Sequence, residues 1–148
     1  MKTFEELLKL KGTGSSVGDL RGIGGQSIEE IIANIPVHAT SPRFAPEPDG
    51  SKVGLKFVWT DADGVTNRFR AHDIDPSTPA GSNAADEWIA RWQKGKEYYD
   101  PVKGDFAHRN AHKPDSPFSD PAAANNTHIP IKTPADWLIE ILKGAGKK

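Results

Sequence analysis

The chain has 148 residues, with 19 basic and 20 acidic side chains, a net charge of −1 and no cysteine. This length suits one domain with its own hydrophobic core, and the balanced charge excludes a global attraction to nucleic acid or anionic membranes. The lack of cysteine excludes disulfides and thiolate chemistry, and no apolar run is long enough for a signal peptide or a membrane-spanning helix, so no membrane insertion is expected.

The first 25 residues predict a short helix followed by a flexible linker. Thr3 and Glu6 have the spacing of a capping box at the start of "FEELLKLKG". Residues 12–26, "GTGSSVGDLRGIGGQ", are rich in glycine and serine, a composition that is typical of flexible linkers. We therefore expect residues 1–25 to be a junction and residues 26–148 to form the folded domain.

The domain is expected to begin with a helix and to continue into a β-hairpin. Ser27 and Glu30 form a second capping-box pattern ahead of isoleucines at helical spacing, and Pro36 ends this helix. After a proline-rich loop, "GLKFVWT" at 54–60 alternates apolar and polar residues, and "DADG" turns the chain into "VTNRFRAH" at 65–72.

A second loop is predicted at 75–83. The next segment, residues 84–93, fits both a helical and a strand pattern. The segment has helical spacing with Asn83 as a cap, but Trp88, Ala90 and Trp92 also alternate as in a strand. The aromatic content favours the strand.

The last third of the chain predicts a long loop, a short strand and a helix. The loop covers residues 101–126, and "THIPI" at 127–131 reads as an edge strand because proline lacks a backbone donor. Thr133 would cap a helix whose buried stripe comprises Trp137, Leu138, Ile141 and Leu142. The predicted fold class is α+β: N-terminal helices, a bent antiparallel sheet and a C-terminal helix.

Arg68, Arg70 and His72 occupy alternate positions of the predicted strand, so their side chains share one face. RNA cleavage without a metal needs a base for the 2′-hydroxyl, an acid for the leaving oxygen and a cation for the phosphate. Histidine titrates in the right range for both proton roles. His72 would fill one role, and His128 would fill the other if the edge strand lies beside the hairpin. Arg70 would stabilise the phosphorane, and Thr127 would orient a phosphate oxygen. The assignment of acid and base stays open.

A second basic set follows in the chain and suits a phosphate backbone, with Tyr98 or Tyr99 as a surface for base stacking. This set comprises Arg91, Lys94, Lys96 and Lys103. The alternative interpretation is structural: the strand arginines would pair with Asp61, Asp63 and Asp73 on a solvated face. The remaining histidines fall in predicted loops, and no spacing predicts a metal site or a cofactor.

Several motifs occur in an order that resembles the polymorphic toxin type 30 domain of bacteria. They are "GLKFVWTDADGVTNRFRAHDIDP", "PAGSNAADEW", "KGKEYYD" and "SPFSDPAAANNTHIPI", and the resemblance covers roughly residues 27–131. Its Arg-x-His element falls on Arg70 and His72, its basic-aromatic element on Lys96 and Tyr98, and its terminal element on Thr127 and His128.

The resemblance implies a ribonuclease toxin with RNA as its substrate. We expect tRNA to be among the candidate substrates and the α+β fold to be of the barnase or EndoU kind. It also implies a C-terminal domain of a larger secreted or cell-surface protein, which acts in the cytoplasm of a target bacterium. A cognate immunity protein would neutralise it, and a basic active site predicts that this partner is acidic.

Two other functions stay open. An NAD-consuming or ADP-ribosyl-transferring toxin would use Arg70, His72 and Tyr98 around the nicotinamide, and a non-catalytic binding module would need none of them for chemistry. Metal-dependent DNA cleavage is less favoured because the acidic residues fall mainly in turns and at helix starts.

Overall fold

The protein is described from a computed structural model, which covers residues 3–41, 53–74 and 81–146. Most of the two predicted loops at 39–53 and 75–83 lies outside these residues. In chain order the elements are α1 (Phe4–Leu8), α2 (Ile28–Ala33), β1 (Gly54–Thr60), β2 (Thr66–His72), α3 (Asn83–Asp86), β3 (Ile89–Lys94), β4 (Glu97–Asp100), β5 (Asp105–Phe106), α4 (Pro121–Asn126), β6 (Ile129–Pro130) and α5 (Asp136–Gly146).

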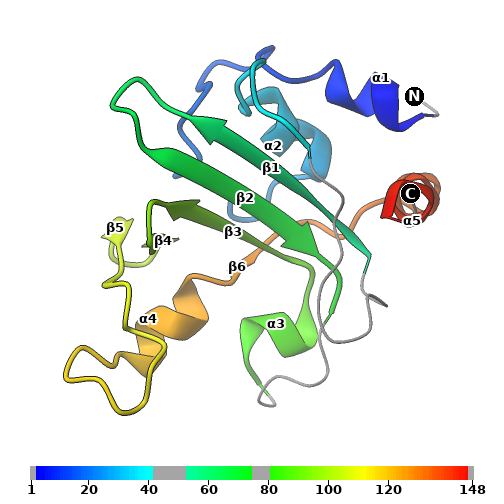
Figure 1. Cartoon of the computed structure of the whole chain (residues 1–148). Helices are drawn as coiled ribbons and strands as arrows, with labels where there is room; N and C mark the ends of the chain where they lie inside the picture. The colour runs from blue at the N-terminus through cyan, green and yellow to red at the C-terminus, as the bar shows by residue number, and fades with distance from the viewer. Residues whose placement is uncertain (1–2, 42–52, 75–80, 147–148) are drawn as a thin grey trace.

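The strands form one antiparallel sheet in the order β1-β2-β3-β4-β5, and β6 pairs with β3 beside this path (Figure 1). The predicted hairpin of β1 and β2 is confirmed, and Gly64 supplies the positive φ, 79°, that its turn requires. The α+β prediction, with an antiparallel sheet between terminal helices, is also confirmed. In the described part of the chain, no helix has the length and apolarity to cross a bilayer.

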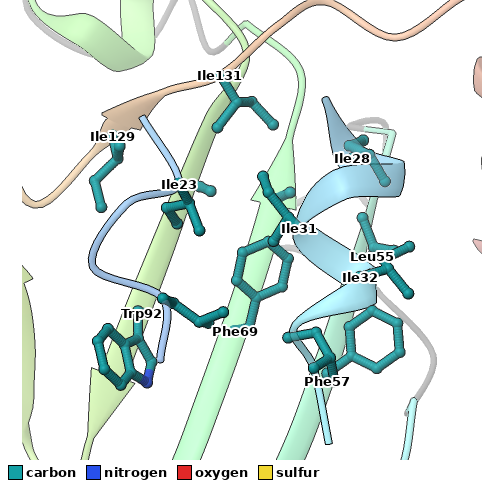
Figure 2. Close-up of a cluster of buried hydrophobic side chains, with 14 of the residues drawn as sticks. Ile23, Ile28, Ile31, Ile32, Leu55, Phe57, Phe69, Trp92, Ile129 and Ile131 are labelled. Carbon is teal, nitrogen blue, oxygen red and sulfur yellow. The ribbon is translucent and has the colours of Figure 1, made fainter. Parts of the chain in front are cut away.

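The hydrophobic core lies between one face of the sheet and helices α1, α2 and α5. Figure 2 shows Phe57 and Phe69 of the hairpin facing Ile31 and Ile32 of α2, and all four side chains are at most 1% exposed. The predicted capping box of α2 is present. The Ser27 hydroxyl accepts from the backbone amide of Glu30, and the Glu30 carboxylate accepts from the backbone amide of Ser27. This helix is thereby fixed over the hairpin.

The ambiguous segment 84–93 divides between the two predictions. α3 ends at Asp86, Glu87 is extended at φ −143° and ψ 161°, and β3 runs from Ile89. The favoured strand is therefore confirmed for 89–94, and the helical pattern covers four residues only. The strand predicted at 127–131 is confirmed over Ile129–Pro130 (β6) only, because Thr127 ends α4. The expected long loop contains β5 and the helix α4, whose N-cap is Asp120.

The C-terminal helix begins at Asp136, later than expected, and the prediction that Trp137 is buried is wrong. Trp137 is 43% exposed, whereas Leu138 and Leu142 are buried against the core. Leu138 and Leu142 lie four residues apart on the side of α5 that faces the core, and Trp137 falls outside this side.

The segment that was expected to be a linker runs along α2. The backbone amide of Gly14 donates to the carbonyl of Ala33, and that of Gly18 donates to Asn34. Leu20 and Ile23 reach the core and are at most 1% exposed. The domain boundary near residue 26 stays a prediction, but the preceding segment contributes two side chains to the core.

Candidate functional site

The two faces of β2 differ as the sequence predicts. Asn67, Phe69 and Ala71 are buried, whereas the side chains between them are half-buried and point away from the core helices. We call this side of the sheet, opposite α1, α2 and α5, the arginine face. It carries Lys56, Arg68, Arg70, His72, Arg91, Gln93 and Tyr98.

The register of the strands sets three cations side by side on the arginine face. Lys56 lies opposite Arg70, and Arg70 lies opposite Arg91. Like charges that face each other across strands destabilise a sheet. Within residues 3–41, 53–74 and 81–146, no carboxylate forms an ion pair with any of the three. This cation row, Lys56–Arg70–Arg91, is therefore suited to an external anion.

Asp61 does not pair with the strand arginines, so this part of the structural interpretation is wrong. Its carboxylate accepts from the side chain of Asn67 at 2.9 Å and from the backbone of Val65 at 3.0 Å, and it lies 3.6 Å from the ammonium of Lys94. The Asn67 hydrogen bond is the main reason why the pKa of Asp61 is lowered. The Asp61 carboxylate therefore stabilises the hairpin turn and does not neutralise Arg68 or Arg70.

Arg91 lies where the sheet divides. β4 pairs with the end of β3 at Gln93 and Lys94, β6 pairs with its start, and Arg91 falls between the two partners. Its guanidinium carbon is 3.6 Å from the centroid of the Tyr98 ring, and Nη2 donates to Oγ1 of Thr127 at 3.4 Å. Arg70 contacts the same tyrosine, since its Nη1 donates to the Tyr98 hydroxyl at 3.4 Å.

The Arg91 guanidinium is partly desolvated. Burial lowers its pKa, the charge of Arg70 acts in the same direction, and Tyr98 opposes both. Its buried Nε has no hydrogen-bond partner among the described residues. A buried cation with an unused donor is costly, and an anion in front of it would supply both a countercharge and an acceptor.

The two predicted catalytic histidines are held in the same way. Nδ1 of His72 lies 2.8 Å from the carbonyl oxygen of Asp73, and Nδ1 of His128 lies 2.9 Å from that of Ala124. A carbonyl oxygen only accepts, so each Nδ1 carries a proton. In the neutral form of both rings, Nε2 is therefore the nitrogen with the lone pair that can take up a proton.

The sheet register relates these histidines through Ile89, which pairs with His72 on one side and with Pro130 on the other. Pro130 is thus two strands from His72, about 10 Å across the sheet, and His128 lies two residues before it. Ile129 points into the core, so Pro130 projects to the side of His72. The register therefore brings His72 and Pro130, which follows His128 by two residues, onto the same face of the sheet.

Of the other predicted site residues, Thr127 and Arg68 lie near the cation row, and Lys96 lies far from it. Thr127 is 3% exposed; its hydroxyl donates to the Ala124 carbonyl at 2.9 Å and accepts from Arg91, so it holds the guanidinium in place. Arg68 lies two residues before Arg70 on the arginine face, opposite Gln93. Lys96 is exposed in the β3–β4 turn, at the end of the sheet away from His72.

Sequence reasoning missed two features of this region. Lys56 joins the cation row only through the register of β1 with β2. His112 was expected to be a solvated loop residue; it is exposed, but it lies at the rim of a cavity of about 410 Å³ that His128 also lines. Of the two tyrosines, only Tyr98 is on the arginine face, because Tyr99 packs in the core against Trp92.

No group of three His, Cys, Asp or Glu side chains within the described ranges is placed to hold a metal ion. The donors of the arginine face are cationic or neutral: three guanidinium groups, an ammonium, an imidazole, an amide and a phenol. Such a set suits recognition of an anion such as phosphate.

Comparison with known proteins identifies the family. A family model described as Bacterial toxin 30 matches residues 30–132, which is 103 of the 148 residues (132 − 30 + 1). Compared with curated proteins and with solved structures, the chain matches none. The matched region contains all of the sheet and the whole arginine face. The chain belongs to the Bacterial toxin 30 family and is a bacterial toxin domain.

Proposed function

We propose that this toxin domain is an endoribonuclease that cleaves RNA by metal-independent transesterification. The proposal is supported by the cation row, with His72 two residues from Arg70 on β2 and with His128 next to Thr127, which accepts a hydrogen bond from Arg91. Both histidines have Nδ1 beside a carbonyl oxygen. One imidazole takes the proton of the 2′-hydroxyl, and the 2′-oxygen attacks the phosphorus. The bond from phosphorus to the 5′-oxygen breaks, and the other imidazole protonates this oxygen.

His72 and His128 divide these two proton transfers between them. Arg70 and Arg91 offset the charge that develops on the phosphorane oxygens, because pre-positioned cations stabilise a transition state without reorganising. Tyr98 contacts both guanidinium groups, and Thr127 acts through Arg91 as a positioning residue. The products would be a 2′,3′-cyclic phosphate and a free 5′-hydroxyl.

Arg68, two residues before Arg70 on β2, extends the cationic surface and would contact a neighbouring phosphate. Lys96, at the far end of the sheet, would contact the RNA backbone only outside the cleavage site. Because the chain carries a net charge of −1, affinity for RNA depends on this local surface and falls steeply with salt. tRNA is one candidate substrate.

The same surface defines the proposed immunity partner. An acidic cognate protein that covers the arginine face would block substrate access and would also supply carboxylates to the cation row. We propose that the domain is delivered as the C-terminal part of a larger secreted or cell-surface protein, and that it acts in the cytoplasm of the target bacterium.

The test is cleavage of total bacterial RNA by the purified protein in EDTA, with the new RNA ends mapped. We expect 2′,3′-cyclic phosphate ends, and we expect His72→Ala and His128→Ala each to reduce cleavage at least about a hundredfold. His38→Ala is the matched control, because His38 lies in the loop after α2. Circular dichroism checks that all three variants fold.

Intact RNA under these conditions would end the proposal. Loss of NAD from poisoned cells with RNA unchanged would select the NAD-consuming alternative. Toxicity that survives both histidine substitutions would select a non-catalytic binding module.

A further inference from the structure

We infer that the cavity beside His128 is a nucleobase subsite, which holds one unstacked base of the RNA next to the bond that is cut. This inference rests on the proposed function. The cavity lies between α3, α4 and the loop that precedes α4, and Figure 1 shows these two helices at the same end of the sheet. Its volume of about 410 Å³ falls within the range of roughly 300–1,000 Å³ that is typical of ligand pockets.

The lining of the cavity suits an uncharged planar ring. Ala84 and Ala111 are buried at its floor, and Pro114 and Pro121 lie exposed at its rim. Serine, asparagine and histidine side chains supply donors and acceptors, and the described lining residues include no Lys, Arg, Asp or Glu. A phosphate finds no countercharge there, whereas a base fits small apolar walls with a few polar groups.

The cavity is directly connected to the proposed site of chemistry. The His128 ring lines it and is anchored to the carbonyl of Ala124, which is another lining residue. The preceding residue, Thr127, accepts a hydrogen bond from Arg91 of the cation row. A base in the cavity would therefore place its ribose beside His128 and the attached phosphate at the guanidinium groups.

Hydrogen bonds of Asn83 join the segments that line the cavity. The amide of Asn83 donates to Oδ1 of Asn125 at 2.9 Å, and the side chain of Asn83 donates to the His128 carbonyl at 3.0 Å. Asn83 thus ties α3 both to α4 and to the residue that precedes β6. A pocket that is preformed in this way binds without the cost of ordering its walls.

A stacked pair of rings beside the cavity offers a surface for the neighbouring base. The rings of His108 and Phe118 are 3.9 Å apart at 12°, and Phe118 is 54% exposed. The residue after Phe118, Ser119, lines the cavity, and the next amide, that of Asp120, donates to the Ala111 carbonyl at 2.8 Å. Exposed aromatic rings bind single-stranded bases by stacking.

The test fills the cavity from α4. Ala124→Leu places a larger side chain in it, and Ala122→Leu is the matched control, because Ala122 is exposed on the same helix and does not line the cavity. Both changes keep a good helix former. We expect Ala124→Leu to lower kcat/KM for RNA by about tenfold or more and to change which linkages are cut. Ala122→Leu should leave both unchanged.

A binding measurement separates this inference from the ribonuclease proposal. Uncharged nucleosides, each of the four in turn, are titrated into the 15N-labelled protein, with inorganic phosphate as a parallel arm. We expect a nucleoside to shift amide resonances around the cavity in the native protein and in Ala122→Leu but not in Ala124→Leu. His112→Ala, which changes an exposed rim residue, should weaken the same shifts even if Ala124→Leu folds poorly.

The outcomes are distinct. RNA cleavage with an unchanged pattern in Ala124→Leu, together with no nucleoside shift at the cavity, would overturn the subsite and leave the ribonuclease in place. Nucleoside shifts at the cavity that Ala124→Leu abolishes would support base binding there even if RNA stays intact, in which case only the ribonuclease proposal fails.

Discussion

The guanidinium carbon of Arg91 lies 3.6 Å from the centroid of the Tyr98 ring, at the point where β4 and β6 separate along β3. Burial lowers the pKa of this arginine, and the electrostatic effect of Tyr98 opposes that shift. The aromatic face of Tyr98 also attracts the cation. Tyr98 also accepts from Arg70, so one phenol orients two neighbouring cations of the row. A bound anion would reduce the repulsion between the two guanidinium groups. It would also accept from Nε of Arg91, which has no partner among the described residues.

The first prediction concerns the energy of this contact. Replacing Tyr98 by Ala removes the ring, so the free energy of unfolding should fall by about 1–2 kcal/mol, of which about 0.5–2 kcal/mol is coupling to Arg91. Tyr98→Phe keeps the ring and should cost no more than about 0.5 kcal/mol, because the lost hydrogen bond to Arg70 is long.

Urea denaturation of Tyr98→Ala, Arg91→Met and the double variant measures the coupling. Tyr98→Phe with and without Arg91→Met is the control. Strictly additive single effects would mean that the ring does not stabilise the guanidinium.

The second prediction is a conflict between stability and activity at Arg70. Lys56 and Arg91 flank it on the neighbouring strands, so Arg70→Met removes two repulsions and keeps most of the side chain's length. We expect the free energy of unfolding to rise by about 0.2–1 kcal/mol at low salt, with a smaller gain at high salt, while RNA cleavage is lost.

Thermal unfolding at two salt concentrations, beside an RNA assay, checks this prediction. Gln93→Met, a half-buried polar residue of the same face, controls for the added apolar side chain. If Arg70→Met lowers the free energy of unfolding by more than about 1 kcal/mol, then Arg70 stabilises the fold. That result would contradict our inference that the cation row destabilises the sheet.

The hairpin and its arginine face could be predicted from the sequence because both depend on short-range rules. Side chains alternate along a strand, and Asp61 and Gly64 mark the turn that joins β1 to β2. The capping box at Ser27 is equally local, since all its atoms lie within three residues. Arg68 and Arg70 could thus be placed on one face without a structure.

The surroundings of Arg91 and the cavity could not be predicted because they depend on contacts between distant segments. Arg91 meets Thr127, 36 residues on, and Asn83 meets Asn125, 42 residues on. Neither pair has a sequence pattern, and the relevant helix, α4, is only six residues long. Whether Trp137 or Leu138 is buried likewise depends on which side of α5 faces the sheet.

The third prediction tests the glycine-rich segment before α2. Its composition indicates a linker, but Leu20 is fully buried in the core. Leu20→Ala should therefore lower the free energy of unfolding by about 2–5 kcal/mol, as expected for a truncated core leucine. Val17→Ala, at a 45% exposed position of the same segment, should cost no more than about 0.5 kcal/mol.

Chemical denaturation of both variants distinguishes a core segment from a junction. If Leu20→Ala unfolds at the same denaturant concentration as the native chain, the segment is detachable, and the domain begins near residue 26 as the composition suggests.

The fourth prediction concerns the tautomers of the histidines. The carbonyl groups of Asp73 and Ala124 require a proton on Nδ1 of His72 and His128, whereas Nε2 of His38 lies 3.0 Å from the carbonyl of Thr60 and requires the opposite tautomer. His38 is therefore an internal reference for the same measurement. A general base at Nε2 is possible only in the tautomer expected for His72 and His128.

Long-range 1H–15N correlation spectra, recorded at alkaline pH where imidazoles are neutral, report which ring nitrogen is protonated. We expect Nε2 of His72 and His128 to show the shift of an unprotonated nitrogen and Nε2 of His38 to show that of a protonated one. The histidine-to-alanine variants assign each signal. Protonated Nε2 in either His72 or His128 would remove that residue from the role of base, because its lone pair would then lie on the nitrogen that faces a carbonyl oxygen.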